Sequence, residues 1–251
     1  MNLYFELLRK PVFTIEYVNQ YYNKIESARS AVKRLVGKGL AVKIRNNLYT
    51  CISGETGAPL ANRYQIASAI TPSAYVSHHT AMEYYGVSNQ VFYEVYVSSQ
   101  EVFRDFEFDG YAYHCVCSKC DKGIESANYS GGVRVTDRER TVIDSIKDMD
   151  KISGLEEVTE NIQSISRLDE KRLLAYLEYY GNQFLYQKTG FLLEPQKGRL
   201  SLSDDFFKAC KERIGLSKRY LTRDCQAGKY DSNWRLVISP ETYNLKNGGG
   251  I

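Results

Sequence analysis

The sequence lacks any apolar run of the roughly 18 residues that a membrane-spanning helix needs. Its first residues, MNLYFELLRKP, also lack the basic start and apolar core of a signal peptide. We therefore expect a cytoplasmic protein that makes no contact with a membrane.

The signatures of several common enzyme classes are also missing. The chain contains no P-loop motif GxxxxGKS/T, no GxGxxG, no HExxH and no GxSxG. It also offers no convincing Asp and Glu-x-Lys set on neighbouring predicted strands, as a metal-dependent nuclease would need. We expect no enzymatic activity, no catalytic residue and no cofactor, and a nuclease built on scattered carboxylates stays an alternative.

The charge is unevenly spread along the 251 residues, although the net charge is only +3. Residues 1–53 hold nine basic and three acidic residues, whereas the rest of the chain holds 24 basic and 27 acidic ones. A basic segment on a slightly acidic remainder indicates that the segment meets a polyanion.

This basic segment has the pattern of three helices followed by a hairpin. Helices are expected at 2–10, 15–22 and 27–39, and strands at 40–45 and 48–53. If Asn46 and Asn47 form a two-residue turn, both need positive φ, and Ile44 then faces Tyr49 while Val42 faces Cys51. The other side of the hairpin would carry three exposed polar residues: Lys43, Arg45 and Thr50. This order of elements is that of a winged helix-turn-helix.

The third helix separates apolar from polar residues. Ala28, Ala31, Val32 and Leu35 share one face at core spacing, and basic residues and serines occupy the other. We expect the exposed face to enter the major groove of DNA and the hairpin to contact the backbone. The expected DNA-binding residues are Ser27, Arg29, Ser30, Lys33, Arg34, Lys43, Arg45 and Asn46. The alternatives are a solvated basic face and a winged helix that contacts protein. Useful specificity would require a dimer or cooperative binding.

Residues beyond 55 predict a larger, mixed α/β domain. Residues 53–62, SGETGAPLAN, are rich in turn formers and are expected to link two domains at 1–55 and 62–246. Strands are expected at 92–99 and 111–117, and the helices alternate with them. The expected fold class is therefore α+β, with an N-terminal winged helix-turn-helix and a larger mixed α/β C-terminal domain.

Three clusters of polar residues carry alternatives. His114, Cys115, Cys117 and Cys120 could hold zinc, act as a redox sensor or be ordinary core residues. The absence of a second Cys or His pair favours the last, so we expect no metal site. The triplet His78-His79-Thr80 is better explained by packing than by catalysis, because adjacent helical residues point about 100° apart. The 21 tyrosines could stack on bases where basic residues surround them, but most lie at core spacing.

One later segment, GGVRVTDRERTVIDSIKD, predicts a strand followed by a helix. Thr136 and Glu139 have the spacing of a capping box at the start of that helix. Arg140 and Asp144 lie four residues apart and are expected to form a pair. This pair would be structural, or alternatively would support a functional surface.

The sequence resembles the AbiEi family of antitoxins from type IV toxin–antitoxin systems, which are also transcriptional repressors. Three stretches carry the resemblance, in this order: FTIEYVNQYY…SARSAVKRLVGKGLAVKIRNNLY, YVSHHTAMEYYGV and GGVRVTDRERTVIDSI. The family often has glycine immediately before the LY of the hairpin, where this chain has Asn47. Beyond residue 150 only the layout is similar.

The resemblance implies a DNA-binding antitoxin of an abortive-infection, or phage-defence, system. The winged helix, with its reading helix at 27–38 and its wing at 40–52, would bind inverted repeats in the promoter of its own operon. The second domain would counter a nucleotidyltransferase-like toxin without needing a stable complex with it. Two alternatives remain: a transcriptional regulator with a ligand-sensing domain and no toxin, and a nuclease targeted by a winged helix.

Overall fold

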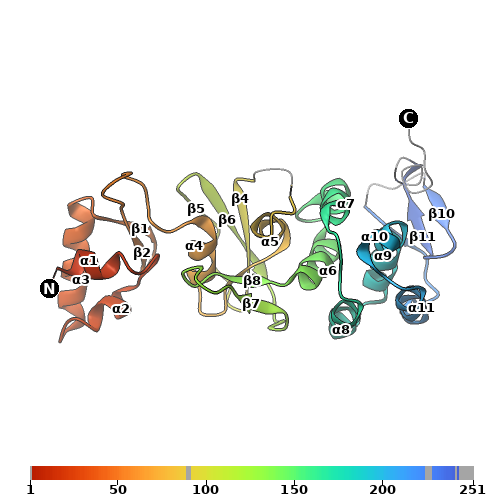
Figure 1. The fold of residues 1–251 in the computed structure, drawn as a ribbon, viewed down its shortest axis with the longest axis horizontal. Helices are drawn as coiled ribbons and strands as arrows, with labels where there is room; N and C mark the ends of the chain where they lie inside the picture. The colour runs from red at the N-terminus through yellow and green to blue at the C-terminus, as the bar shows by residue number, and fades with distance from the viewer. Residues whose placement is uncertain (1, 89–91, 224–227, 241, 243–251) are drawn as a thin grey trace. The chain divides into compact units, whose positions relative to one another are not determined.

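The computed structural model describes residues 2–88, 92–223, 228–240 and 242, and it shows a protein of the α+β class (Figure 1). The α+β class that the sequence predicts is therefore confirmed. The chain divides into two compact units: one is Met1–Thr80 with Val91–Thr136, and the other is Ala81–Gln90 with Asp137–Ile251. Within the described residues, no helix has both the length and the apolar character needed to cross a bilayer.

The first unit begins with three helices and a two-stranded antiparallel sheet, coloured red to orange in Figure 1. The elements are α1 (Leu3–Leu7), α2 (Ile15–Asn19), α3 (Ile25–Gly37), β1 (Ala41–Arg45) and β2 (Leu48–Cys51). We call this set the N-terminal module. Leu7, Val18, Ala28 and Cys51 are fully buried in its core. Thr14 caps α2, because its hydroxyl accepts a hydrogen bond of 3.2 Å from the backbone N–H of Tyr17.

The segment at 53–62 folds back on the hairpin instead of extending away from it. Ile52 forms a β-bridge with Pro59, and the backbone N–H of Ser53 donates to the carbonyl of Ala58. The backbone N–H of Ala61 donates to the hydroxyl of Thr50 at 3.1 Å. The segment therefore lies within the first unit, and the domain boundaries at 55 and 62 stay a prediction.

The rest of the first unit is built on a six-stranded sheet in the order β5-β6-β4-β3-β8-β7. The strands are β3 (Tyr75–Val76), β4 (Glu94–Ser99), β5 (Phe106–Phe108), β6 (Tyr111–Cys117), β7 (Ile124–Ser126) and β8 (Arg134–Thr136). Strands β4 and β6 pair in parallel along their lengths, and the edge strands β5 and β7 are antiparallel to their neighbours. Helix α4 (Arg63–Ala69) packs on β3, β4 and β8. The boundary between the units falls within α5 (His78–Tyr84).

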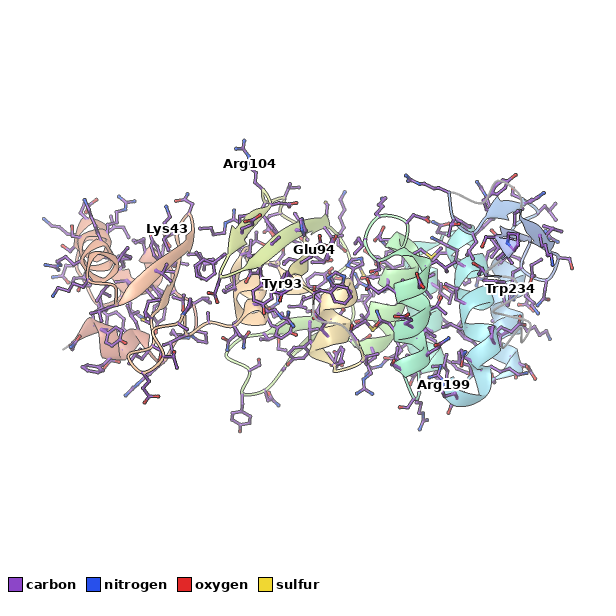
Figure 2. All side chains as sticks on the ribbon, turned by 90° about the horizontal axis from the view of Figure 1, so that it is seen from above. Lys43, Tyr93, Glu94, Arg104, Arg199 and Trp234 are labelled. Carbon is purple, nitrogen blue, oxygen red and sulfur yellow. The ribbon has the colours of Figure 1, made fainter. Side chains whose placement is uncertain are left out.

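The second unit consists mainly of helices around one apolar core, and a small sheet lies near the C-terminus. The helices are α6 (Arg138–Asp148), α7 (Gly154–Ser164), α8 (Glu170–Tyr180), α9 (Gln183–Leu193), the 3-10 turn η1 (Glu194–Gln196), α10 (Lys197–Leu200) and α11 (Asp204–Arg213). The strands are β9 (Arg219–Tyr220), β10 (Lys229–Asp231) and β11 (Leu236–Ile238). The fully buried ring of Trp234, labelled in Figure 2, lies so close to Gly190 that a Cβ there would be 2.1 Å from it. Helix α9 therefore needs glycine at this position.

Candidate nucleic-acid interface

Helix α3 has the two faces that its sequence predicts. Ala28, Ala31 and Val32 are buried, because their spacing of three and four residues places them on the side that packs against α2 and the hairpin. The backbone of Gly39 has a φ of 68°, a left-handed conformation that suits the end of a helix. The opposite face is polar and exposed, so it is free for a partner.

The register of the hairpin differs from the expectation. Ala41 pairs with Cys51, Val42 with Thr50 and Lys43 with Tyr49, and the register shifts between Lys43 and Arg45. The expected pairs Ile44–Tyr49 and Val42–Cys51 are therefore wrong. Thr50, expected on the exposed side, is fully buried. The physical reason is the bulge, which adds one residue to β1 and changes the side to which the following residues point.

Only one turn residue of the hairpin has positive φ, whereas two were expected. Asn47 has a φ of 57°. Its Oδ1 accepts a hydrogen bond of 3.0 Å from the backbone N–H of Ile15, and its Nδ2 donates to the carboxylate of Glu16 at 2.7 Å. The second bond holds the pKa of Glu16 below its ordinary value. Asn47 thus ties the hairpin turn to the first turn of α2.

An open hollow of about 570 Å³ lies between α3 and the hairpin. Its lining comes from three parts of the N-terminal module: Ile15 and Glu16 on α2; Arg29, Val32, Lys33 and Val36 on α3; and Lys43, Asn46, Asn47 and Tyr49 on the hairpin. Figure 2 shows the side chain of Lys43 on this hairpin. We call this feature the α3–hairpin hollow.

Four of the eight expected DNA-binding residues line the hollow: Arg29, Lys33, Lys43 and Asn46. All four are exposed. Within the described part of the chain, the three cationic side chains form no hydrogen bond or ion pair. Cations that are held near one another without protein partners favour an anionic ligand.

Three more expected residues, Ser27, Ser30 and Arg34, are exposed on α3 beside the hollow. They follow one another at intervals of three and four residues, so they form a second stripe on the helix. The polar face of α3 therefore offers two neighbouring stripes, of which one borders the hairpin.

Arg45 lies elsewhere, contrary to the expectation that it extends from the hairpin towards DNA. Its guanidinium carbon is 5.3 Å from the ring centroid of Phe103 and 5.2 Å from that of Phe106. The residue is only partly exposed, and its Nη1 is buried. The bulge in β1 is the physical reason, because it alters the direction of the side chain that follows it. We therefore leave Arg45 out of the contact surface.

Sequence reasoning missed three residues that shape the hollow. Val36 is 37% exposed, and it continues the stripe of Arg29 and Lys33 along α3. Glu16 places a carboxylate in the hollow, and Tyr49 forms part of its lining. Helical spacing from Arg29 and Lys33 could have identified Val36, whereas the other two depend on the packing of α2 against the hairpin.

The polar residues around α5 act within the fold. His78 and His79 are 1% and 2% exposed. The hydroxyl of Ser77 is 2.9 Å from Nδ1 of His78, and Nε2 of His79 is 3.0 Å from the carbonyl oxygen of Glu94. The ring of His79 also stacks on Phe92 at 4.4 Å. The two histidines are buried, and both rings lie against Tyr96, which fits the packing role expected for them.

The side chains of His114 and Cys115 have separate partners. Nδ1 of His114 lies 2.8 Å from a carboxylate oxygen of Asp105, and the Sγ of Cys115 accepts from the N–H of Phe103 at 3.5 Å. Cys117 is exposed and Cys120 is buried. Among the described residues, no group of three or more His, Cys, Asp or Glu side chains is arranged to hold a metal ion.

Arg140 and Asp144 form the expected pair inside the second unit. The Nε of Arg140 donates to the Asp144 carboxylate at 2.8 Å, and the two side chains are 0% and 3% exposed. The expected capping box is wrong by one residue. The cap is Asp137, which accepts from the N–H of Arg140 at 2.7 Å, because Thr136 is held in β8 by its pairing with β7.

A second open hollow, of about 450 Å³, lies at one end of β4, β5 and β6. Its lining includes Tyr93, Glu94, Glu107, Asp109 and Tyr111. Three carboxylates would repel a polyanion, so this hollow is unsuited to nucleic acid.

No protein-family model matches the chain, and no curated protein matches it. Among solved structures, the chain is similar to the crystal structure of the RV2827C protein from Mycobacterium tuberculosis, with a TM-score of 0.63. The sequence identity is 12%, and the match covers 99% of this chain and 94% of that one. At this identity the likeness concerns the fold alone.

Proposed function

We propose that the N-terminal module is a winged helix-turn-helix that binds duplex DNA. The observation that carries this proposal is the α3–hairpin hollow, which Arg29, Lys33 and Lys43 line and where the single carboxylate of Glu16 faces three cations. Helix α3 is the reading helix, and the hairpin of β1 and β2 is the wing. A DNA duplex is the usual ligand of an exposed helix that is followed by a basic hairpin.

The two stripes of α3 have different tasks in this proposal. Ser27, Ser30 and Arg34 read base edges in the major groove, where arginine pairs well with guanine. Arg29, Lys33 and Lys43 hold a phosphate backbone in the hollow, and Asn46 donates a hydrogen bond to it. The methyl groups of Val36 offer a contact for thymine.

The protein's role in the cell follows from the resemblance to AbiEi antitoxins. We propose that the chain represses its own operon by binding inverted repeats, as a dimer or cooperatively. We further propose that the remainder of the chain counters a nucleotidyltransferase-like toxin. Two of the three motifs that carry this resemblance form β3–α5 and β8–α6, where buried polar residues such as His79 and Arg140 act within the fold. The antitoxic residues are therefore to be sought on exposed positions.

A gel shift with DNA from directly upstream of the gene tests the DNA-binding half of the proposal. We expect a specific shift that survives excess scrambled duplex and weakens steeply between about 50 mM and about 200 mM salt. Absence of a specific shift would reduce the module to a protein-contact element. Cleavage of the probe in the presence of divalent metal would instead favour the nuclease alternative.

Variants of the hollow test the assigned residues. Lys33→Ala with Lys43→Ala should weaken operator binding about 10-fold or more. The slope of log affinity against log salt concentration should become less steep by about two, because two phosphate contacts are lost. Arg9→Ala with Lys10→Ala is the matched control, since it removes two exposed cations beyond the end of α1 that do not line the hollow. Equal losses from both variants would mean that only net charge matters.

The antitoxin half needs a separate measurement. The neighbouring toxin gene is induced together with the wild-type protein or with the variant Lys33→Ala, Arg34→Ala. Both should restore growth, since repression and antitoxicity belong to different parts of the chain. If there is no toxin gene nearby, or neither protein restores growth, the regulator with a ligand-sensing domain becomes the better explanation.

A further inference from the structure

The C-terminal sheet exposes two tyrosine rings on one face. In the order β10-β11-β9, Tyr230 and Tyr220 both pair with Val237 on the central strand. Residues paired across neighbouring strands point to the same side of a sheet, so the two rings flank Val237. Their Cα atoms are separated by two strand spacings, which is about 10 Å.

The opposite face of this sheet is its buried side. Leu236 and Ile238 are fully buried and belong to the apolar core of the second unit, as does Leu221, which follows β9. Val237 points the other way and lies beneath the tyrosines, whose residues are 54% exposed at Tyr220 and 49% exposed at Tyr230. Val237 itself is only 4% exposed, so the two tyrosines form the part of this face that solvent reaches.

These tyrosines are not explained by packing. A structural tyrosine usually buries its ring and gives its hydroxyl a partner. Here both rings are about half exposed, and within the described residues neither hydroxyl forms a hydrogen bond. The helix stretch AYLEYY in α8 provides the contrast, because Tyr176 is buried and donates its hydroxyl to Asp137.

One cation lies on the tyrosine face, and the sequence around the sheet is basic. The Nζ of Lys218 lies 5.5 Å from the ring centroid of Tyr230, which places this cation on the tyrosine face. Described residues 214–223 and 228–238 contain five basic side chains and one acidic one. The basic residues are Lys218, Arg219, Arg223, Lys229 and Arg235. Arg219 and Lys229 pair with Leu236 and Ile238, so their side chains point to the other face of the sheet. The slightly acidic balance of the chain beyond residue 53 is thus reversed here.

We propose that this face binds single-stranded RNA. Tyr220 and Tyr230 each stack on an unpaired base, and Lys218, beside the ring of Tyr230, holds a phosphate between them. Exposed aromatic rings on a sheet among cations are the means by which proteins hold unpaired bases, whereas a duplex hides the faces of its bases. RNA is favoured over DNA because its loops and ends present unpaired bases permanently. The proposal is independent of the DNA-binding module.

Fluorescence anisotropy with a labelled, unstructured RNA of about 12 nucleotides tests it. The full-length protein carries Lys33→Ala and Lys43→Ala, so that the N-terminal module contributes little. We expect binding at low salt, and a loss of about 10-fold in affinity for each of Tyr220→Ala and Tyr230→Ala. Tyr220→Phe should retain the affinity within about twofold, since it keeps the ring.

The controls separate stacking from general charge or misfolding. Tyr129→Ala removes a fully exposed ring from the first unit and should leave RNA affinity unchanged. Circular dichroism checks that each variant is folded, and Lys218→Glu provides a second way to weaken the site without removing a ring. No binding of RNA, equal losses from Tyr129→Ala and Tyr230→Ala, or tighter binding of single-stranded DNA or double-stranded RNA of the same sequence would each overturn the proposal.

Discussion

The guanidinium of Arg45 lies against the ring of Phe106, with 5.2 Å between its central carbon and the ring centroid. Phe103 approaches the same guanidinium at 5.3 Å. Phe106 belongs to β5 and Arg45 to β1, so this contact joins the hairpin to the six-stranded sheet of the same unit. A residue that the sequence places among DNA contacts thus has an architectural role.

Replacing Arg45 by alanine should therefore affect stability more than DNA binding. We expect the free energy of unfolding to fall by about 1–2 kcal/mol, because a partly buried cation–π contact and the packing of the side chain are lost. Urea denaturation measures this loss. A double-mutant cycle with Phe106→Leu should show coupling of about 0.5 kcal/mol or more.

Lys43→Ala is the matched comparison on the same strand. It should leave stability within about 0.5 kcal/mol of wild type, because its side chain is exposed. Operator affinity should fall more in Lys43→Ala than in Arg45→Ala, the reverse of the expected effect on stability. A larger loss of operator affinity at Arg45 would return Arg45 to the contact surface.

The helical periodicity of the sequence was sufficient to predict the buried face of α3 and the ion pair within α6. The spacing of Ala28, Ala31 and Val32 predicted the buried face of α3, since a helix places such residues on one side whatever it packs against. Arg140 and Asp144 were likewise paired by helical spacing alone. Features that depend on 3.6 residues per turn are local, and they can be read from a short stretch.

The hairpin register and the role of Arg45 could not be predicted in this way. The bulge in β1 accompanies a turn whose one left-handed residue, Asn47, is tied to α2 some 30 residues earlier in the chain. The partners of Arg45 lie about 60 residues later. At the start of α6, adjacent Thr136 and Asp137 are both good caps, and only the pairing of β8 decides between them. These choices are made by tertiary contacts.

Substitutions at Asn47 should separate the cost of backbone strain from the loss of its hydrogen bonds. Asn47→Gly keeps the left-handed backbone but removes the bonds to Ile15 and Glu16, so we expect a loss of about 1 kcal/mol. Asn47→Ala should lose about 1 kcal/mol more, because a Cβ is unfavourable at positive φ. Urea denaturation at pH 7 measures both.

The effect of Asn47 should also depend on pH. Its bond lowers the pKa of Glu16 from 4.5 in the folded state, so this contribution to stability is present above that pH. It is lost as the pH falls through the lowered pKa and the carboxylate becomes protonated in both states. The difference between wild type and Asn47→Gly should therefore shrink below about pH 4. A difference that stays constant from pH 7 to that range would show that the bond to Glu16 contributes nothing.

The buried pair of Arg140 and Asp144 should be sensitive to the loss of one partner. Asp144→Ala removes the buried carboxylate that accepts from the Nε of Arg140, and we expect a loss of about 3–5 kcal/mol in unfolding free energy. The double variant Arg140→Met, Asp144→Leu should lose less, because no uncompensated charge remains. Chemical denaturation compares the two proteins. A double variant that is less stable than Asp144→Ala would mean that the pair stabilises through more than mutual neutralisation.

The cysteines should differ sharply in their reactivity towards alkylating reagents. Burial raises the pKa of the Cys51 thiol to about 11 and that of Cys210 to about 12. Only about one Cys51 thiol in a thousand is then ionised at pH 8, and the thiolate is the reactive form. Cys117 is exposed at the end of β6, so a reagent can reach it.

We expect iodoacetamide to modify Cys117 within minutes at pH 8 and to spare Cys51 and Cys210 until denaturant is added. Mass spectrometry of the digested protein measures this difference. In Cys117→Ser, the rapid modification at this site should disappear while the other two stay protected. Modification of Cys51 at the rate of Cys117 in the native protein would mean that the core of the N-terminal module opens readily.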